Sequence, residues 1–302
     1  MPRRPLIKQI GWTLRDYAKR VWDNSGEDNI FFLASGIAFN ILLAAVPFLL
    51  LMVSGLATLL NQSAEASSAT VTELVDRLLP THPVGSRSPI TQLLLDIIKA
   101  RGSITLYSAI GFVWFSTRLF GSLRSVLAEV FDIEQDRGII EGKIFDIKIT
   151  VISTLLFVAY TALSAYLAIA TTRGVRVLTT LGIRSETMGR VEFTFGQLVA
   201  FAFIVMMFFA LYKFLPNRRI RWQTALLAAV FTSVLFEVAK NVFTAYVRSF
   251  NPGSLYTGTL AAIVILVIWV YYAATIFILG GEVAQVYELR RVRRQQRATL
   301  ED

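Results

Sequence analysis

The sequence has no cysteine and only one histidine among its 302 residues. The absence of cysteine excludes a disulfide framework and a thiolate metal site. Charged residues make up 17% of the chain, below the roughly 25% of an average soluble domain. Hydrophobic residues, in contrast, make up 55%, and the mean hydropathy is +0.57. This composition is typical of a membrane protein.

Six runs in the sequence are long and apolar enough to cross a bilayer, which takes about 20 residues. Four runs are uncharged, the second carries Arg118 and Arg124, and the fifth carries Glu237 and Lys240. The first run is too long for a signal peptide and lacks its small-residue cleavage pattern, so we expect a mature helix. We therefore predict an all-α, polytopic membrane protein with spans at about 31–60, 104–127, 149–172, 193–212, 222–247 and 259–281.

The positive charges predict the orientation of these spans. Of the 30 Lys and Arg residues, eighteen lie on the side that holds both termini, nine lie in the opposite loops, and three lie within spans. Basic residues collect in cytoplasmic segments. Both termini are therefore expected to be cytoplasmic.

Three further segments surround or interrupt the predicted membrane domain, 29–283. Residues 1–28 have helical apolar periodicity and basic residues on other faces, which indicates an interfacial amphipathic helix; a helix packed on cytoplasmic loops is the alternative. Residues 61–102 contain two apolar-periodic stretches around a Pro- and Gly-rich break, which predicts an external helical hairpin, acting as a packing lid or as a gate. Residues 284–302 form a basic cytoplasmic tail.

Polar residues follow one face of span five. Glu237 and Lys240, three residues apart, can partly neutralise each other. An ionised group at mid-bilayer costs at least about 2.5 kcal/mol, so this face is expected to line the bundle interior or a wet cavity. The stripe consists of Ser233, Glu237, Lys240, Asn241, Thr244 and Arg248.

Two other spans carry polar groups at similar predicted depths. Arg118 in span two is a predicted partner for Glu237, and Asn40 in span one reaches about the depth of Arg118. Pro47 loosens the backbone ladder above Asn40. These positions predict a polar interior built from spans one, two and five. The alternative is that they only lock helices together, as do the small pairs Ala34 and Ala38, and Ala225 and Ala229.

At this point the motifs resemble those of the YihY/BrkB-like membrane proteins. The resemblance covers nearly the whole chain and rests on AFNILLAAVPFLLL, VWFSTRLFGSLRSVLAEVF, LYKFLPNRRIRWQTALLAAVFTSVLFEVAKNVFTAYV, LYTGTLAAIVILVIWVYY and LGGE. Members often have an aromatic residue where this chain has Asn40. The family pattern falls on Pro47, Arg118, Leu215, Pro216, Arg219, Glu237, Lys240, Tyr246, Tyr256, Gly258, Tyr271, Gly281 and Glu282.

The resemblance implies a six-helix protein of the inner membrane with cytoplasmic termini. Members have been linked to virulence or serum resistance and to export of lipid-like molecules, and the family has carried a ribonuclease label. The residues argue against that label. His82 lies alone in an outer loop. The acids of the short cytoplasmic loop between spans two and three show no metal-ligand spacing; they are Glu134, Asp136, Glu141 and Asp146. We expect no enzyme activity, no metal, no cofactor and no nucleic-acid partner.

Transport is the sharper hypothesis. Arg118, Glu237 and Lys240 sum to +1, which favours an anionic headgroup, while apolar faces accommodate acyl chains. Membrane lipids with anionic headgroups are then the partners, and the predicted polar pathway is Arg118, Glu237, Lys240, Asn241 and Asn40. The alternative is a non-transporting scaffold for envelope proteins. The predicted gate or helix-locking residues are Pro47, Tyr246, Tyr256, Gly258, Gly281 and Glu282.

Glu282 follows Gly280 and Gly281, which permit close helix approach. It could gate the inner end of span six or pair with a cytoplasmic Lys or Arg. We favour the ion pair.

Overall fold

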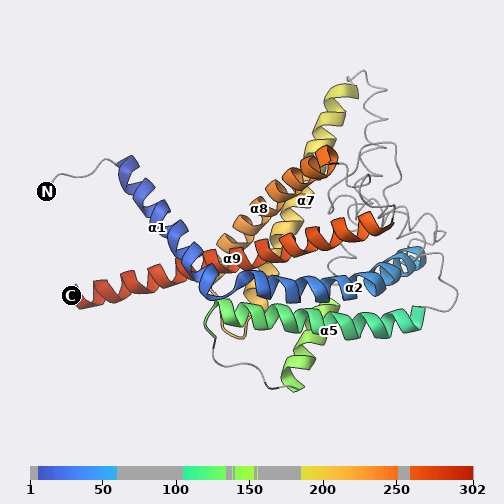
Figure 1. Ribbon diagram of the computed structural model, residues 1–302, viewed down its shortest axis with the longest axis horizontal. Coiled ribbons are helices and arrows are strands. Elements are labelled where there is room, and N and C mark those ends of the chain that lie inside the picture. The colour runs from blue at the N-terminus through green and yellow to red at the C-terminus, as the bar shows by residue number, and fades with distance from the viewer. Residues whose placement is uncertain are drawn as a thin grey trace.

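The computed structural model describes residues 6–59, 105–133, 138, 140–152, 155, 185–250 and 259–301, whose regular structure is entirely helical (Figure 1). A further helical segment at 140–152 precedes the predicted third span, most of which lies outside the described residues. The predicted hairpin at 61–102 also lies outside them. The labelled helices are α1 (Leu6–Glu27), α2 (Ile30–Leu59), α5 (Thr105–Val130), α7 (Ser185–Phe214), α8 (Trp222–Phe250) and α9 (Thr259–Glu301).

The predicted membrane class agrees with these helices. By length and hydropathy, three of the described helices qualify as candidate membrane spans, in α2, α8 and α9. Apolar side chains are exposed along the outside of α8, at Val234, Val238 and Val242. Because these residues recur every four positions on one helix face, that face suits contact with lipid.

Helix α9 is the centre of the described helices and packs against α1, α2, α5 and α8 (Figure 1). Helix α2 also packs on α5, and α7 on α8, so the neighbours follow the order α7, α8, α9, α2, α5. Small residues form these contacts: Ala34 on α2 and Ala225 and Ala229 on α8 are completely buried. Small side chains let the helix backbones approach closely.

Two left-handed residues end helices on one side of this arrangement. Asn29, with φ 49°, turns the chain from α1 into α2. Asp132, also with φ 49°, ends α5, where the amide of Ile133 donates to the carbonyl of Ala128 at 2.8 Å. This six-to-one hydrogen bond and the left-handed residue before it form a Schellman cap. Asn and Asp tolerate this conformation better than most residues other than glycine.

The predicted tail at 284–302 continues α9 without a break. The 43 residues of α9 give a length of about 65 Å, roughly twice the hydrocarbon thickness of a bilayer. The C-terminal part of α9 therefore projects beyond any membrane that its N-terminal part crosses. Helix α1 lies at the same end of the bundle (Figure 1).

Candidate functional site

The polar stripe of α8 is held together within its own helix. Lys240 Nζ lies 2.7 Å from Glu237 Oε1, so the ion pair predicted from their spacing forms. Asn241 donates to the Glu237 carbonyl at 2.8 Å, and Thr244 donates to the Lys240 carbonyl at 2.7 Å. The Lys240 side chain is 21% exposed and that of Glu237 41% exposed. The pair therefore lies at an open edge of the described bundle.

Arg118 lies apart from this pair. Its side chain is exposed on α5. Within the described residues it makes no hydrogen bond or ion pair with Glu237 or with any other group. The reason is the packing: α5 and α8 each pack on α9, which lies between them (Figure 1). The predicted partnership of Arg118 with Glu237 is therefore not seen, and Lys240 takes that place.

The remaining residues of the predicted pathway and gate are dispersed. Asn40 donates to the Gly36 carbonyl at 2.9 Å on its own helix, α2. Pro47 is buried, and a Cβ added at Gly111 on α5 would lie 4.0 Å from Pro47 Cβ. Tyr246 is exposed, with its ring 6.3 Å from that of Phe243. Tyr256 and Gly258 lie outside the described residues.

Gly280 and Gly281 place α9 against its neighbours. A Cβ added at Gly280 would lie 1.8 Å from Thr232 Oγ1 on α8 and 2.4 Å from the Tyr212 hydroxyl on α7. One added at Gly281 would lie 3.0 Å from Val130 Cγ1 on α5. Only glycine fits at the first position, and the second tolerates a side chain only if the neighbour moves. The GGE motif is therefore a point of closest helix approach.

A ladder of aromatic rings continues from this junction along α7, α8 and α9. Ring centroids lie 5.0 to 6.3 Å apart between successive members, within the range of favourable aromatic contacts. The ladder runs through Tyr212, Phe277, Phe208, Phe236, Trp269 and Phe243. Because Phe236 precedes Glu237, the polar stripe borders this apolar ladder on α8.

A buried ion pair that the sequence did not indicate joins α5 to segment 140–152. Arg124 NH1 lies 3.4 Å from Asp146 Oδ1, with side-chain exposures of 11% and 1%. The sequence prediction placed Asp146 in a short cytoplasmic loop, but residues 140–152 are helical and Asp146 is buried. A Cβ at Gly142 would lie 2.8 Å from Arg124 NH1, so the guanidinium rests against the backbone there. Gly142 is the one feature of the sequence that could have pointed to this contact, because a glycine leaves room for a large side chain against the backbone.

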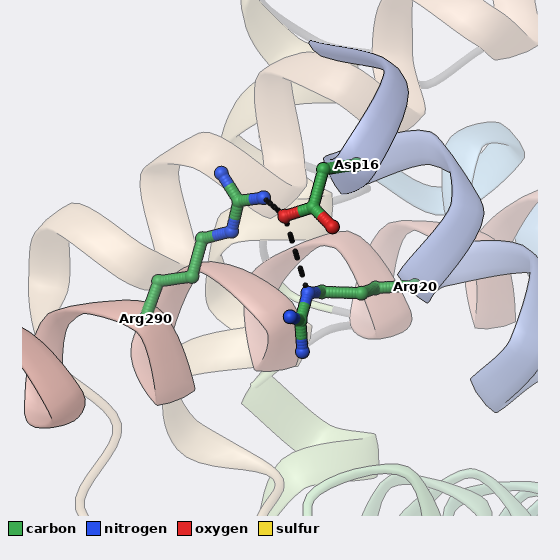
Figure 2. A network of polar contacts seen from close by, with 3 residues as sticks. All are labelled: Asp16, Arg20 and Arg290. Carbon is green, nitrogen blue, oxygen red and sulfur yellow. Dashed lines mark hydrogen bonds and ion pairs between the residues drawn. The ribbon is translucent and has the colours of Figure 1, made fainter. Parts of the chain in front are cut away.

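A second polar group, here called the α1–α9 clasp, comprises Asp16, Tyr17, Arg20, Val283 and Arg290. Asp16 pairs with Arg290 and, at 3.3 Å, with Arg20 (Figure 2). The Tyr17 hydroxyl donates to the Val283 carbonyl, and the Arg290 guanidinium lies 5.1 Å from the centre of the Tyr17 ring. Burial raises the pKa of Tyr17 to about 12.

The clasp also affects Asp16. Desolvation would raise the pKa of Asp16, but the hydrogen bond from Arg20 and the charges of Arg20 and Arg290 hold it below its ordinary value. The clasp fixes one face of α1 to the projecting part of α9. The predicted amphipathic helix is therefore anchored at least partly on protein, and Trp22 on α1 stays 78% exposed.

Long apolar helices with apolar side chains exposed on their outer faces define the class: an integral, multi-pass membrane protein. The family model of the virulence factor BrkB matches residues 21–301, so the chain belongs to this family. The resemblance seen in the motifs is confirmed.

Its relatives are described as UPF0761 membrane proteins. The one from Vibrio cholerae is 26% identical over 222 residues, which are 73% of this chain and 71% of the relative. The one from Pelodictyon phaeoclathratiforme is 27% identical over 271 residues, which are 89% of this chain and 59% of the relative. The one from Kangiella koreensis is 28% identical over 280 residues, which are 91% of this chain and 64% of the relative. The chain thus spans less than two thirds of the last two. No solved structure matches it.

Proposed function

We propose that the protein translocates an anionic amphiphile, with a lipid as the substrate class, along the polar positions of its helix bundle. The observation that carries this proposal is Arg118, an exposed cation without a partner among the described residues. Arg118 lies 13 residues from the first residue of α5 and 12 from the last, or roughly 20 and 18 Å along the helix. It therefore lies near mid-membrane if α5 spans the bilayer.

A cation at this depth needs an anion or water, because hydrocarbon solvates it poorly. A phosphate or carboxylate headgroup suits the planar guanidinium, which can donate two parallel hydrogen bonds. The apolar residues Ile110 and Trp114 precede Arg118 at steps of four on α5, and both are more than 60% exposed. A headgroup on Arg118 would therefore have an apolar strip beside it for an acyl chain.

The pair Glu237 and Lys240 offers a second polar step on another helix. Glu237 lies 15 residues beyond the start of α8, or about 22 Å along it. Because Lys240 is partly neutralised by Glu237, it would hold an anion more weakly than Arg118 does. Weak binding sites suit a transport path, because the headgroup must leave each site as well as enter it.

Translocation in liposomes tests the proposal. Purified wild type and Arg118→Gln are reconstituted with a labelled anionic phospholipid, and the fraction of label accessible from outside is followed with time. Arg118→Gln is expected to slow translocation at least about tenfold, because it removes a charge-assisted hydrogen bond worth about 1.5–3 kcal/mol. The matched control is Arg293→Gln, which removes an exposed arginine from the projecting part of α9. Arg118→Lys is expected to restore part of the rate.

Insertion and thermal stability are measured on the same samples. A slow Arg118→Gln protein that inserts and melts like wild type supports the pathway. Wild-type liposomes that behave like empty ones would exclude autonomous lipid translocation and favour the scaffold alternative.

A further inference from the structure

Glu282 is a completely buried carboxyl group with a relative exposure of 0%. Among the described residues, neither of its carboxylate oxygens has a hydrogen-bond partner of normal geometry. The ion pair with Lys or Arg that the sequence suggested is not found within the described residues. A buried ionised carboxylate without a partner costs several kcal/mol, so this side chain needs another means of neutralisation.

The groups that act on Glu282 come from three parts of the chain and make ionisation harder. Asp28 lies in the turn between α1 and α2, and Asp132 lies in the turn that ends α5. Both carboxyl groups interact unfavourably with a negative Glu282, while the Asn24 amide on α1 is the favourable contact. Like charges in one site disfavour a second ionisation.

Gln285, about one turn beyond Glu282 on α9, holds the helices around this site together. Gln285 is 6% exposed; its side-chain oxygen accepts a hydrogen bond from Asn24 at 3.3 Å. Its amide donates to Asp132 Oδ2 at 2.6 Å. Gln285 thus ties α1 and the end of α5 to α9, so Glu282 cannot easily swing out of the cluster.

We propose that Glu282 is a proton-binding site and carries its proton at neutral pH, where it faces the carboxylate of Asp28. A proton is the simplest ligand that supplies the missing positive charge and turns an acceptor-only group into a donor. A multivalent metal is a poorer candidate, because no group of three or more His, Cys, Asp or Glu in the described part could hold one.

Water can deliver this proton from one side. Glu282 lies 23 residues from the start of α9, or about 35 Å, which exceeds the roughly 30 Å of hydrocarbon in a bilayer. Asp28 is half-buried and Asp132 is exposed, so the cluster reaches solvent on this side. The inference does not depend on the proposed transport function.

Infrared difference spectroscopy of the purified full-length protein tests this directly. We expect wild type at neutral pH to show the carbonyl stretch of a buried protonated carboxylic acid, and the band to disappear as the pH is raised. Glu282→Gln should lose the band. The control Glu288→Gln should keep it, since Glu288 lies six residues further along α9 and accepts from Thr224 at 2.8 Å. Absence of the band in wild type, or its persistence in Glu282→Gln, would overturn the proposal.

A second variant keeps the test decisive if Glu282→Gln does not fold. Asp28→Asn removes one like charge from the cluster, so Glu282 should lose its proton more easily. The pH at which the band disappears is expected to fall by about one unit or more. An unchanged midpoint in a folded Asp28→Asn protein counts against Glu282 as the proton's site. These readouts are independent of translocation, so either proposal can fail alone.

Discussion

Tyr212 on α7 and Phe277 on α9 are joined twice: their ring centroids lie 5.0 Å apart, and the Tyr212 hydroxyl donates to the Phe277 carbonyl at 2.5 Å. Since the hydroxyl proton is used there, Thr232 on α8 supplies the proton of the 2.8 Å contact between the two hydroxyls. Tyr212 thus links three helices at a completely buried point.

Tyr212→Phe should destabilise the protein by about 1–3 kcal/mol. The ring remains, but Thr232 and the Phe277 carbonyl lose a buried partner, and buried polar groups are costly when unsatisfied. Thermal unfolding in detergent measures the effect. Tyr272→Phe is the control because its side chain is 52% exposed. Equal melting temperatures for both variants would show that the buried bonds contribute nothing.

Gly280→Ala should be more damaging than its size suggests. A methyl group there would lie 1.8 Å from Thr232 Oγ1, so either the Thr232 side chain or the packing of α8 on α9 must shift. Overpacking of this kind costs about 1–3 kcal/mol or more. The matched control is Gly36→Ala, also within a helix, where nothing lies within 4 Å of the added atom. Gly36→Ala should be neutral or slightly stabilising, because alanine favours helix more than glycine does.

Removal of the obstacle gives a further check on Gly280. Thr232→Ala takes away the nearest atom, so the Gly280→Ala/Thr232→Ala protein should be more stable than the sum of the two single losses implies. If the two losses simply added in the double variant, the clash with Thr232 would not be the cause, and the Tyr212 hydroxyl, 2.4 Å from the added Cβ, would be the remaining obstacle.

The helical class and the ion pair of α8 could be read from the sequence because both depend on local spacing. Apolar run length predicts spans, and a separation of three residues predicts the contact of Glu237 with Lys240. The Arg118 partner could not be predicted, since depth along a helix says nothing about which helices are neighbours. Helix α9 packs on both α5 and α8 and lies between them.

The Glu282 and Arg124 environments depended on packing in the same way. Glu282 follows an apolar run in a chain rich in arginine, so a basic partner was a reasonable expectation. The turn residues Asp28 and Asp132 reach it only because α1, α2 and α5 all pack on α9. Arg124 and Asp146 are 22 positions apart on separate helices, and no sequence period connects them.

Asp146→Ala should destabilise the protein by about 3–5 kcal/mol, because it leaves the Arg124 charge buried beside segment 140–152. Lys148→Ala, an exposed position on the same segment, should have little effect. Chemical unfolding or proteolysis of the reconstituted protein gives the comparison. In the Arg124→Leu/Asp146→Leu protein, where neither charge remains, we expect recovery of a substantial part of the loss. A double variant no more stable than Asp146→Ala would mean that the pair is not the source of the effect.

Asp16→Asn should loosen the α1–α9 clasp and lower the melting temperature at neutral pH. The pKa of Asp16 is depressed in the folded protein by Arg20 and Arg290. A depressed folded pKa gives stability that is present above the unfolded value of about 3.9 and is lost as the pH falls through the folded value. The difference between wild type and Asp16→Asn should therefore be constant at neutral pH and shrink below about pH 4. Asp23→Asn is the control, because Asp23 is exposed on the same helix and makes no ion pair with the described residues. If the difference persisted unchanged in acid, the contribution of Asp16 would come from packing or hydrogen bonding rather than from its charge.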